Sequence, residues 1–187
     1  MVSYDRLTII YSLPRSRSQW FTWLFRHACE AWHDGMRGCS SPRAFRDKVL
    51  IYLRENEHKR LVIADTGAIL FYDELERLMP GHRKAFVIRE VQDVIRSLHR
   101  QGVTGLDDMM RRQANMLARH SGGHFVFHFN SITVHELARL WRTVTGEYHR
   151  PLPFFEKANK VYVDTPIKDQ PQAPRAARSL IRFADKR

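Results

Sequence analysis

Short apolar runs that alternate with longer amphipathic segments constrain the fold of this chain more than any other feature. Residues 61–64 (LVIA) and 125–127 (FVF) are apolar throughout, which is typical of strands buried on both faces of a parallel sheet. We expect strands near residues 7–13, 60–64, 84–89, 124–129 and 160–164. We expect helices near residues 18–32, 42–56, 70–79, 91–101, 107–120 and 133–145. This alternation predicts an α/β fold with a mainly parallel sheet covered by helices on both faces.

The length of the chain indicates a single folded domain. Its 187 residues are enough to bury a substantial core, and a hydrophobic content of 43% is that of a globular protein. After Asp164 the composition changes to prolines and basic residues. We therefore expect a domain over residues 1–164 and a basic, proline-containing tail over residues 165–187.

The charge of the chain favours an anionic ligand or partner. Its 31 basic and 20 acidic residues give a net charge of +11. Nucleic acid is a possible but not a favoured partner, because the basic residues are dispersed and form no known nucleic-acid-binding motif. No apolar run approaches the roughly 20 residues that span a bilayer, and no secretory signal is visible. With only Cys29 and Cys39 present, we expect free thiols, no membrane association and a cytoplasmic location.

A strand–loop–helix junction near the N-terminus is the best candidate for an anion site. The apolar run of residues 7–13 stops at Pro14, and an aromatic-rich helical segment follows the polar loop of residues 15–18. The first backbone N–H groups of a helix, with the positive end of its dipole, bind anions. Arginine and serine side chains in the loop add donors for phosphate or sulfate. The loop lacks the G-x-x-x-x-G-K-[ST] pattern of ATP and GTP sites and the G-x-G-x-x-G pattern of dinucleotide sites.

The same loop resembles a motif of a known enzyme family. Residues 14–20 read PRSRSQW, which is similar to the P-[KR]-S-G-[TS]-[TS]-W loop of the P-loop sulfotransferases. These enzymes take a sulfuryl group from 3′-phosphoadenosine 5′-phosphosulfate (PAPS). Arg17 stands where the family has glycine, so a left-handed backbone there is less comfortable. The resemblance implies that PAPS binds to Arg15, Ser16, Arg17, Ser18, Gln19 and Trp20.

A second motif of the same family follows further along the chain. Sulfotransferases hold the 3′-phosphate with a pattern similar to R-x-P-x-D-x-x-x-S, which Arg89, Asp93 and Ser97 match, while Val91 replaces the proline. The alternative is an ordinary strand–helix unit in which Arg89 pairs with a carboxylate. Both motifs occur in the family's order, and the chain resembles the compact sulfotransferases of bacteria and bacteriophages. That resemblance implies a P-loop-like three-layer sandwich.

Sulfuryl transfer needs a general base and cations near the leaving oxygens. The resemblance assigns Arg15 to the leaving phosphate oxygen. His33 is the first candidate for the base, because histidine titrates near neutrality, and Asp34 is the second. Asp65 is the third, because its strand should end at the same sheet edge as Arg15 and Arg89. The chemistry requires no metal ion.

The resemblance therefore implies a PAPS-dependent sulfotransferase. The group that accepts the sulfuryl group is a hydroxyl or amine of a small molecule or a glycan, and the sequence does not specify which. The sequence does not specify the oligomeric state either. Two alternatives stay open: a nucleotide-binding phosphotransferase or kinase with an altered loop, and a non-catalytic module that binds nucleic acid.

Overall fold

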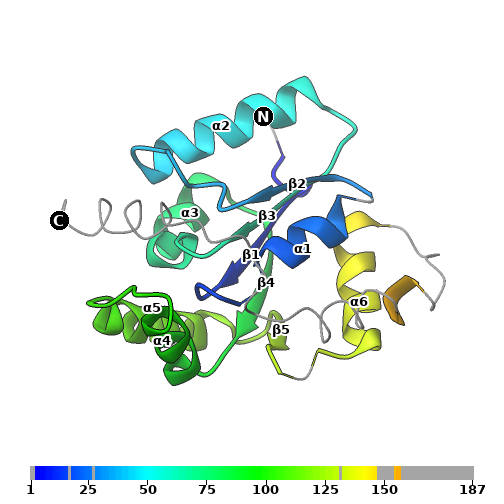
Figure 1. Cartoon of the computed structure of the whole chain (residues 1–187). Coiled ribbons are helices and arrows are strands. Elements are labelled where there is room, and N and C mark those ends of the chain that lie inside the picture. Colours follow the sequence, from blue (N-terminus) through cyan, green and yellow to red (C-terminus); the bar gives the residue numbers. More distant parts are fainter. Residues whose placement is uncertain (1–2, 17, 27, 131, 147–153, 157–187) are drawn as a thin grey trace.

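The fold is built around a five-stranded sheet in which all pairings are parallel (Figure 1). The computed structural model describes residues 3–16, 18–26, 28–130, 132–146 and 154–156. Over these residues the strands are β1 (Leu7–Ser12), β2 (Glu30–His33), β3 (Leu61–Asp65), β4 (Arg83–Ile88) and β5 (Phe125–His128). They lie in the order β2-β3-β1-β4-β5, so β1 is central. The predicted α/β class is confirmed.

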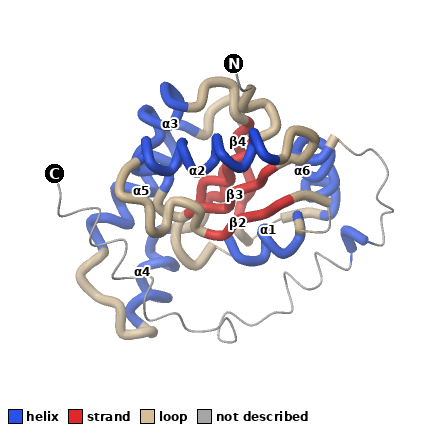
Figure 2. The backbone as a smooth tube through the Cα atoms, turned by 90° about the horizontal axis from the view of Figure 1, so that it is seen from above, coloured by secondary structure: helices blue, strands red, loops and turns tan. Residues whose placement is uncertain are grey.

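Helices cover both faces of the sheet, as Figures 1 and 2 show. The helices are α1 (Ser18–Phe25), α2 (Pro42–Glu55), α3 (Tyr72–Leu78), α4 (Val91–His99), α5 (Asp107–His120) and α6 (Val134–Thr145), with a 3-10 turn, η1 (Ala68–Phe71), before α3. One apolar cluster joins the sheet to α1 and α6, and a second joins it to α2, α3, α4 and α5. The predicted three-layer sandwich is confirmed.

Strand β1 shows why the strands of this sheet are mostly apolar along their whole length. Leu7, Ile9 and Tyr11 pack into the cluster beneath α2–α5, and Ile10 packs into the cluster beneath α1 and α6. All six residues of the strand are buried, because both faces of a central parallel strand are covered. The loop that follows β1 is therefore anchored to the most buried strand of the molecule.

Local signals in the sequence fix the ends of two helices. Ser41 caps α2 by accepting a hydrogen bond from the N–H of Ala44, and Pro42 occupies the first helical position. Thr133 and Glu136 form a reciprocal capping box at the start of α6. Gly146 ends α6 in the left-handed conformation, with φ at 73°.

The prediction of one long helix over residues 18–32 was wrong. Helix α1 ends at Phe25, and residues 30–33 form strand β2, which pairs with β3 from Glu30 opposite Leu61 to His33 opposite Ala64. A strand of four residues at the sheet edge is too short to show a clear period in the sequence. The predicted strand near 160–164 and the tail over 165–187 lie outside the described residues. Within the described ranges, no helix has both the length and the apolar character needed to cross a membrane.

Candidate anion-binding site

The loop between β1 and α1 is a tight turn at the carboxyl end of the central strand. The N–H of Ser16 donates to the carbonyl of Leu13 at 3.3 Å, and Arg15 has a φ of 63°. Pro14 in the second position and a left-handed residue in the third are typical of a type II turn. The left-handed position is therefore Arg15. Arg17, which stands at the glycine position of the sulfotransferase motif, lies outside the described residues. A non-glycine residue in this region costs about 1 kcal/mol or more, and such strain is concentrated at functional sites.

Two serine hydroxyls near this turn are buried without a partner. Ser12 at the end of β1 and Ser16 in the loop are both fully buried, and neither Oγ makes a hydrogen bond to a described residue. A buried polar group left unsatisfied costs about 1–3 kcal/mol. Helix α1 begins two residues after Ser16, and the first N–H groups of a helix have no partner within the helix. The junction thus offers hydrogen-bond donors that an anion could use.

Arg89 lies beside the same loop, as the parallel pairing of β1 with β4 requires. Ser12 is opposite Val87 in that pairing, and the Nη1 of Arg89 donates to the carbonyl of Arg15. The Arg89 guanidinium also lies over the ring of Phe129, 4.2 Å from its centroid. Burial lowers the pKa of Arg15 below its usual value, although an arginine remains protonated at any physiological pH. The structure brings two arginines and the loop into one site.

The other predicted cofactor residues are placed in different environments. Ser18 is buried at the first position of α1, and Gln19 is exposed. Trp20 packs into the core, with its ring edge-on to Phe21 at 5.1 Å between centroids. Ser97 is buried on α4, the helix that begins just after Arg89.

His33 is held against the start of α1 at the end of β2. Its Nε2 lies 2.9 Å from the Oγ of Ser18 and 3.5 Å from the Oδ2 of Asp34. Burial lowers the pKa of His33; the Asp34 carboxylate raises it, and the positive charges of Arg37 and Arg26 lower it further. The net direction is downward, so the imidazole is neutral at neutral pH and can accept a proton.

Asp34 links the ends of β2 and β3. Its φ is 48°, and its Oδ1 accepts hydrogen bonds from the N–H and the Oγ1 of Thr66 at 3.2 and 3.1 Å. Thr66 is thus part of the support of this site, although the sequence offered no sign of it beyond its place after Asp65. The contacts of Asp34 orient it toward His33.

Asp65 has the environment of a structural carboxylate. Its Oδ2 accepts from the N–H of Met36, and its Oδ1 accepts from those of Gly67 and Ala68, each at 2.8 Å. Burial and then the charge of Asp34 raise the pKa of Asp65 to about 6, against the lowering effect of the three hydrogen bonds. Because both oxygens are occupied, this geometry favours a role in holding the loops after β2 and β3 over proton abstraction.

Metal ligands are not gathered near the loop. Over the part of the chain that the structure describes, no group of three or more His, Cys, Asp or Glu side chains could hold a metal ion. Cys29 and Cys39 are half-buried and form no disulfide with each other.

The fold defines an α/β protein in which helices cover both faces of a parallel sheet of strand order β2-β3-β1-β4-β5. No protein-family model matches the chain, and a search of curated proteins finds no match. Among solved structures, a gluconokinase from Sinorhizobium meliloti 1021 is similar at 13% identity, with a TM-score of 0.43, over 88% of this chain and 99% of that one. Similarity at this level does not indicate a shared activity.

Proposed function

We propose that the chain is a transferase that takes a sulfuryl group from PAPS. The observation that carries the proposal is the loop after β1, where the buried Oγ of Ser16, two residues before α1, has no hydrogen-bond partner among the described residues. Arg89 lies against the same loop and adds positive charge. Serine and arginine donors suit a phosphosulfate, and the sequence has no Gly-Lys pair for a triphosphate.

The two arginines take different parts of the donor in this proposal. Arg15, Ser16 and Ser18 hold the 5′-phosphosulfate, and Arg89 with Ser97 holds the 3′-phosphate. One N–H group of Arg89 donates to the Arg15 carbonyl. A guanidinium has five such donors, and that of Arg89 lies over the Phe129 ring. Gln19 and Trp20 are left out, since one is exposed and the other packs in the core.

The transfer itself forms one bond and breaks one. The acceptor oxygen or nitrogen bonds to sulfur as the bond from sulfur to the 5′-phosphate oxygen breaks, and that electron pair remains on the departing 3′,5′-bisphosphate. The acceptor's proton goes to the imidazole of His33, whose Nε2 pairs with the Oγ of Ser18 at the start of α1. Arg15 stabilises the charge that develops on the leaving oxygen.

A nucleotide-dependent phosphotransferase is the second candidate. Asp34 follows β2 and Asp65 is the last residue of β3, and Mg²⁺ is bound by carboxylate oxygens in proteins. Against this candidate, both oxygens of Asp65 and one of Asp34 already accept backbone or hydroxyl hydrogen bonds.

Calorimetric titration with 3′-phosphoadenosine 5′-phosphate, ATP with Mg²⁺, and AMP separates the candidates. The proposal predicts a clear preference for the 3′-phosphorylated nucleotide, and a loss of about tenfold or more in Arg15→Ala and Arg89→Ala. Arg54→Ala, which removes an exposed arginine from α2, is the matched control and should bind normally. No preference for the 3′-phosphate overturns the proposal, and selective binding of ATP moves the phosphotransferase forward.

A further inference from the structure

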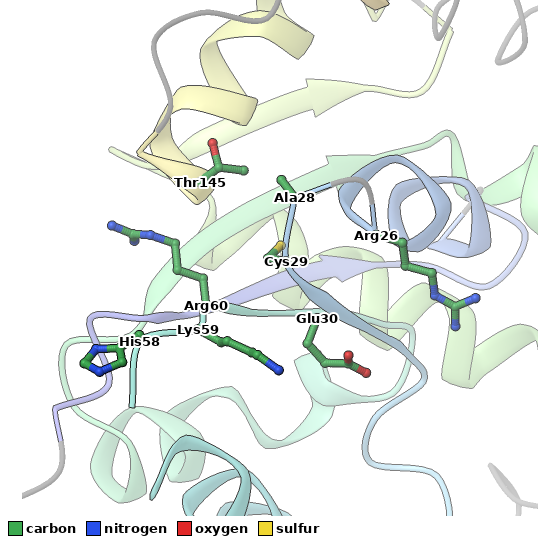
Figure 3. Close-up of a pocket in the computed structure, with 8 residues that line it drawn as sticks. All are labelled: Arg26, Ala28, Cys29, Glu30, His58, Lys59, Arg60 and Thr145. Carbon is green, nitrogen blue, oxygen red and sulfur yellow. The ribbon is translucent and has the colours of Figure 1, made fainter. Parts of the chain in front are cut away.

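A cavity opens at the end of the sheet opposite the loop that follows β1 (Figure 3). It lies where β2 and β3 begin and where α1 and α6 end, whereas the loop follows the carboxyl end of β1. Its volume is about 540 Å³, within the range of small-molecule sites. A ligand in this cavity would therefore be distinct from the donor that the loop holds.

The cavity is lined by cations that lack carboxylate partners. Arg26 comes from the segment after α1, and Lys59 and Arg60 come from the segment that enters β3 (Figure 3). Within the described ranges, none of the three forms an ion pair. Among the described residues that line the cavity, Glu30 alone is acidic, and its Oε1 accepts a hydrogen bond from the indole of Trp32 at 3.0 Å. The cavity therefore carries a net positive charge.

Hydrogen bonds hold the backbone at Lys59, and Arg60 lies against Gly146. The Arg6 guanidinium donates to the carbonyls of Leu53, Asn56 and Lys59, at 3.0, 2.8 and 3.1 Å, and so fixes the segment that carries Lys59. Arg60 lies against Gly146 so closely that a Cβ at Gly146 would be 3.2 Å from its Nη2. A side chain there would press on the guanidinium.

We propose that this cavity binds a small multivalent anion bearing phosphate or sulfate groups. Guanidinium forks match the tetrahedral oxygens of such anions, and a lysine adds a point charge. The Arg6 guanidinium already holds the backbone that carries Lys59, so this segment loses little freedom when an anion binds, which favours affinity. The proposal does not rest on the function of the loop, because the two sites lie at opposite ends of the sheet.

The two cysteines of the chain provide a built-in test. Cys29 lines the cavity and Cys39 does not, so the rates at which iodoacetamide labels the two thiols can be compared by mass spectrometry in one sample. Pyrophosphate is the probe, and sodium chloride at equal ionic strength is the control for screening. At about ten times its dissociation constant, pyrophosphate should slow Cys29 labelling by about tenfold and leave Cys39 unchanged.

Three variants complete the test. Arg60→Gln should lose most of the protection of Cys29, whereas Arg54→Gln, which removes a cation that does not line the cavity, should keep it. Arg15→Ala should keep it too, because that residue belongs to the loop at the other end of the sheet. The proposal is overturned if pyrophosphate does not slow Cys29 labelling, if sodium chloride slows it equally, or if Arg60→Gln retains full protection.

Discussion

Replacing Ser16 with alanine should stabilise the free protein and weaken its binding of the nucleotide. The Ser16 hydroxyl is fully buried and has no hydrogen-bond partner among the described residues. Removing a buried, unsatisfied hydroxyl relieves a cost of about 1–3 kcal/mol. We expect Ser16→Ala to raise the free energy of unfolding by about 1 kcal/mol in the absence of ligand, since the small void left behind offsets part of the gain.

The same change should reduce the affinity for 3′-phosphoadenosine 5′-phosphate. A hydrogen bond to a charged group contributes about 1.5–3 kcal/mol, so the dissociation constant should rise by about tenfold or more. Urea unfolding without ligand and calorimetry with the nucleotide measure the two effects. Ser121→Ala is the control, because Ser121 lies at the end of α5 and donates to the carbonyl of Ala118; it should change neither quantity by more than a small amount.

The reasoning fails if Ser16→Ala destabilises the free protein by 1 kcal/mol or more, which would mean that the hydroxyl already has a partner. It also fails if the variant is more stable but binds the nucleotide as tightly as the original protein. In that case the hydroxyl would be buried for reasons unrelated to an anion.

Three further predictions concern the base, the buried carboxylate and the support of Arg89. The rate of PAPS hydrolysis to the bisphosphate and sulfate should rise with pH through a pKa below 6.5 and then level off, because the base, His33, has a lowered pKa and must be neutral to accept a proton. His33→Ala should remove this rise of the rate with pH while the nucleotide still binds. An unchanged pH profile in the variant contradicts the assignment. Because the pKa of Asp65 is raised to about 6 in the folded protein, the protonated carboxyl stabilises the folded state. This stability is fully present below the unfolded-state pKa and is lost as the pH rises through about 6. In urea unfolding, the stability of the original protein relative to Asp65→Asn should therefore fall by about 1.4 kcal/mol between pH 5 and pH 7.5; no change in the difference would refute the raised pKa. Phe129→Leu removes the ring beneath Arg89. The loss of a cation–π contribution of about 0.5–1 kcal/mol or somewhat more should weaken nucleotide binding about threefold to tenfold, as measured by calorimetry. Unchanged affinity would show that the ring does not position the guanidinium.

The sheet and most of its helices could be predicted because their signals are local or strongly periodic. Helix α5 has the predicted limits of residues 107–120, and α6 begins one residue after its predicted start because Thr133 serves as the cap. Strand β2 could not be predicted in the same way. Its four residues follow an amphipathic helix directly, and it is stabilised by pairing with β3, which is distant in sequence.

The site was predictable in its parts but not in its contacts. The loop at residues 14–20 and Arg89 could be found from residue types and order, since strand ends in a parallel sheet meet at one edge. The bond from Arg89 to the Arg15 carbonyl depends on β1 and β4 being neighbours, and the ring beneath Arg89 comes from the end of β5. The left-handed angle at Arg15 follows from the turn that begins at Leu13. The sulfotransferase motif has its glycine at the position of residue 17 instead.

A crystal structure of the protein with 3′-phosphoadenosine 5′-phosphate tests the central claim most directly. We expect the 5′-phosphate to accept hydrogen bonds from the Oγ of Ser16 and the first N–H groups of α1, and the 3′-phosphate to lie against Arg89. A nucleotide whose 5′-phosphate lies away from the loop of residues 13–18, with Ser16 still unpartnered, would contradict it.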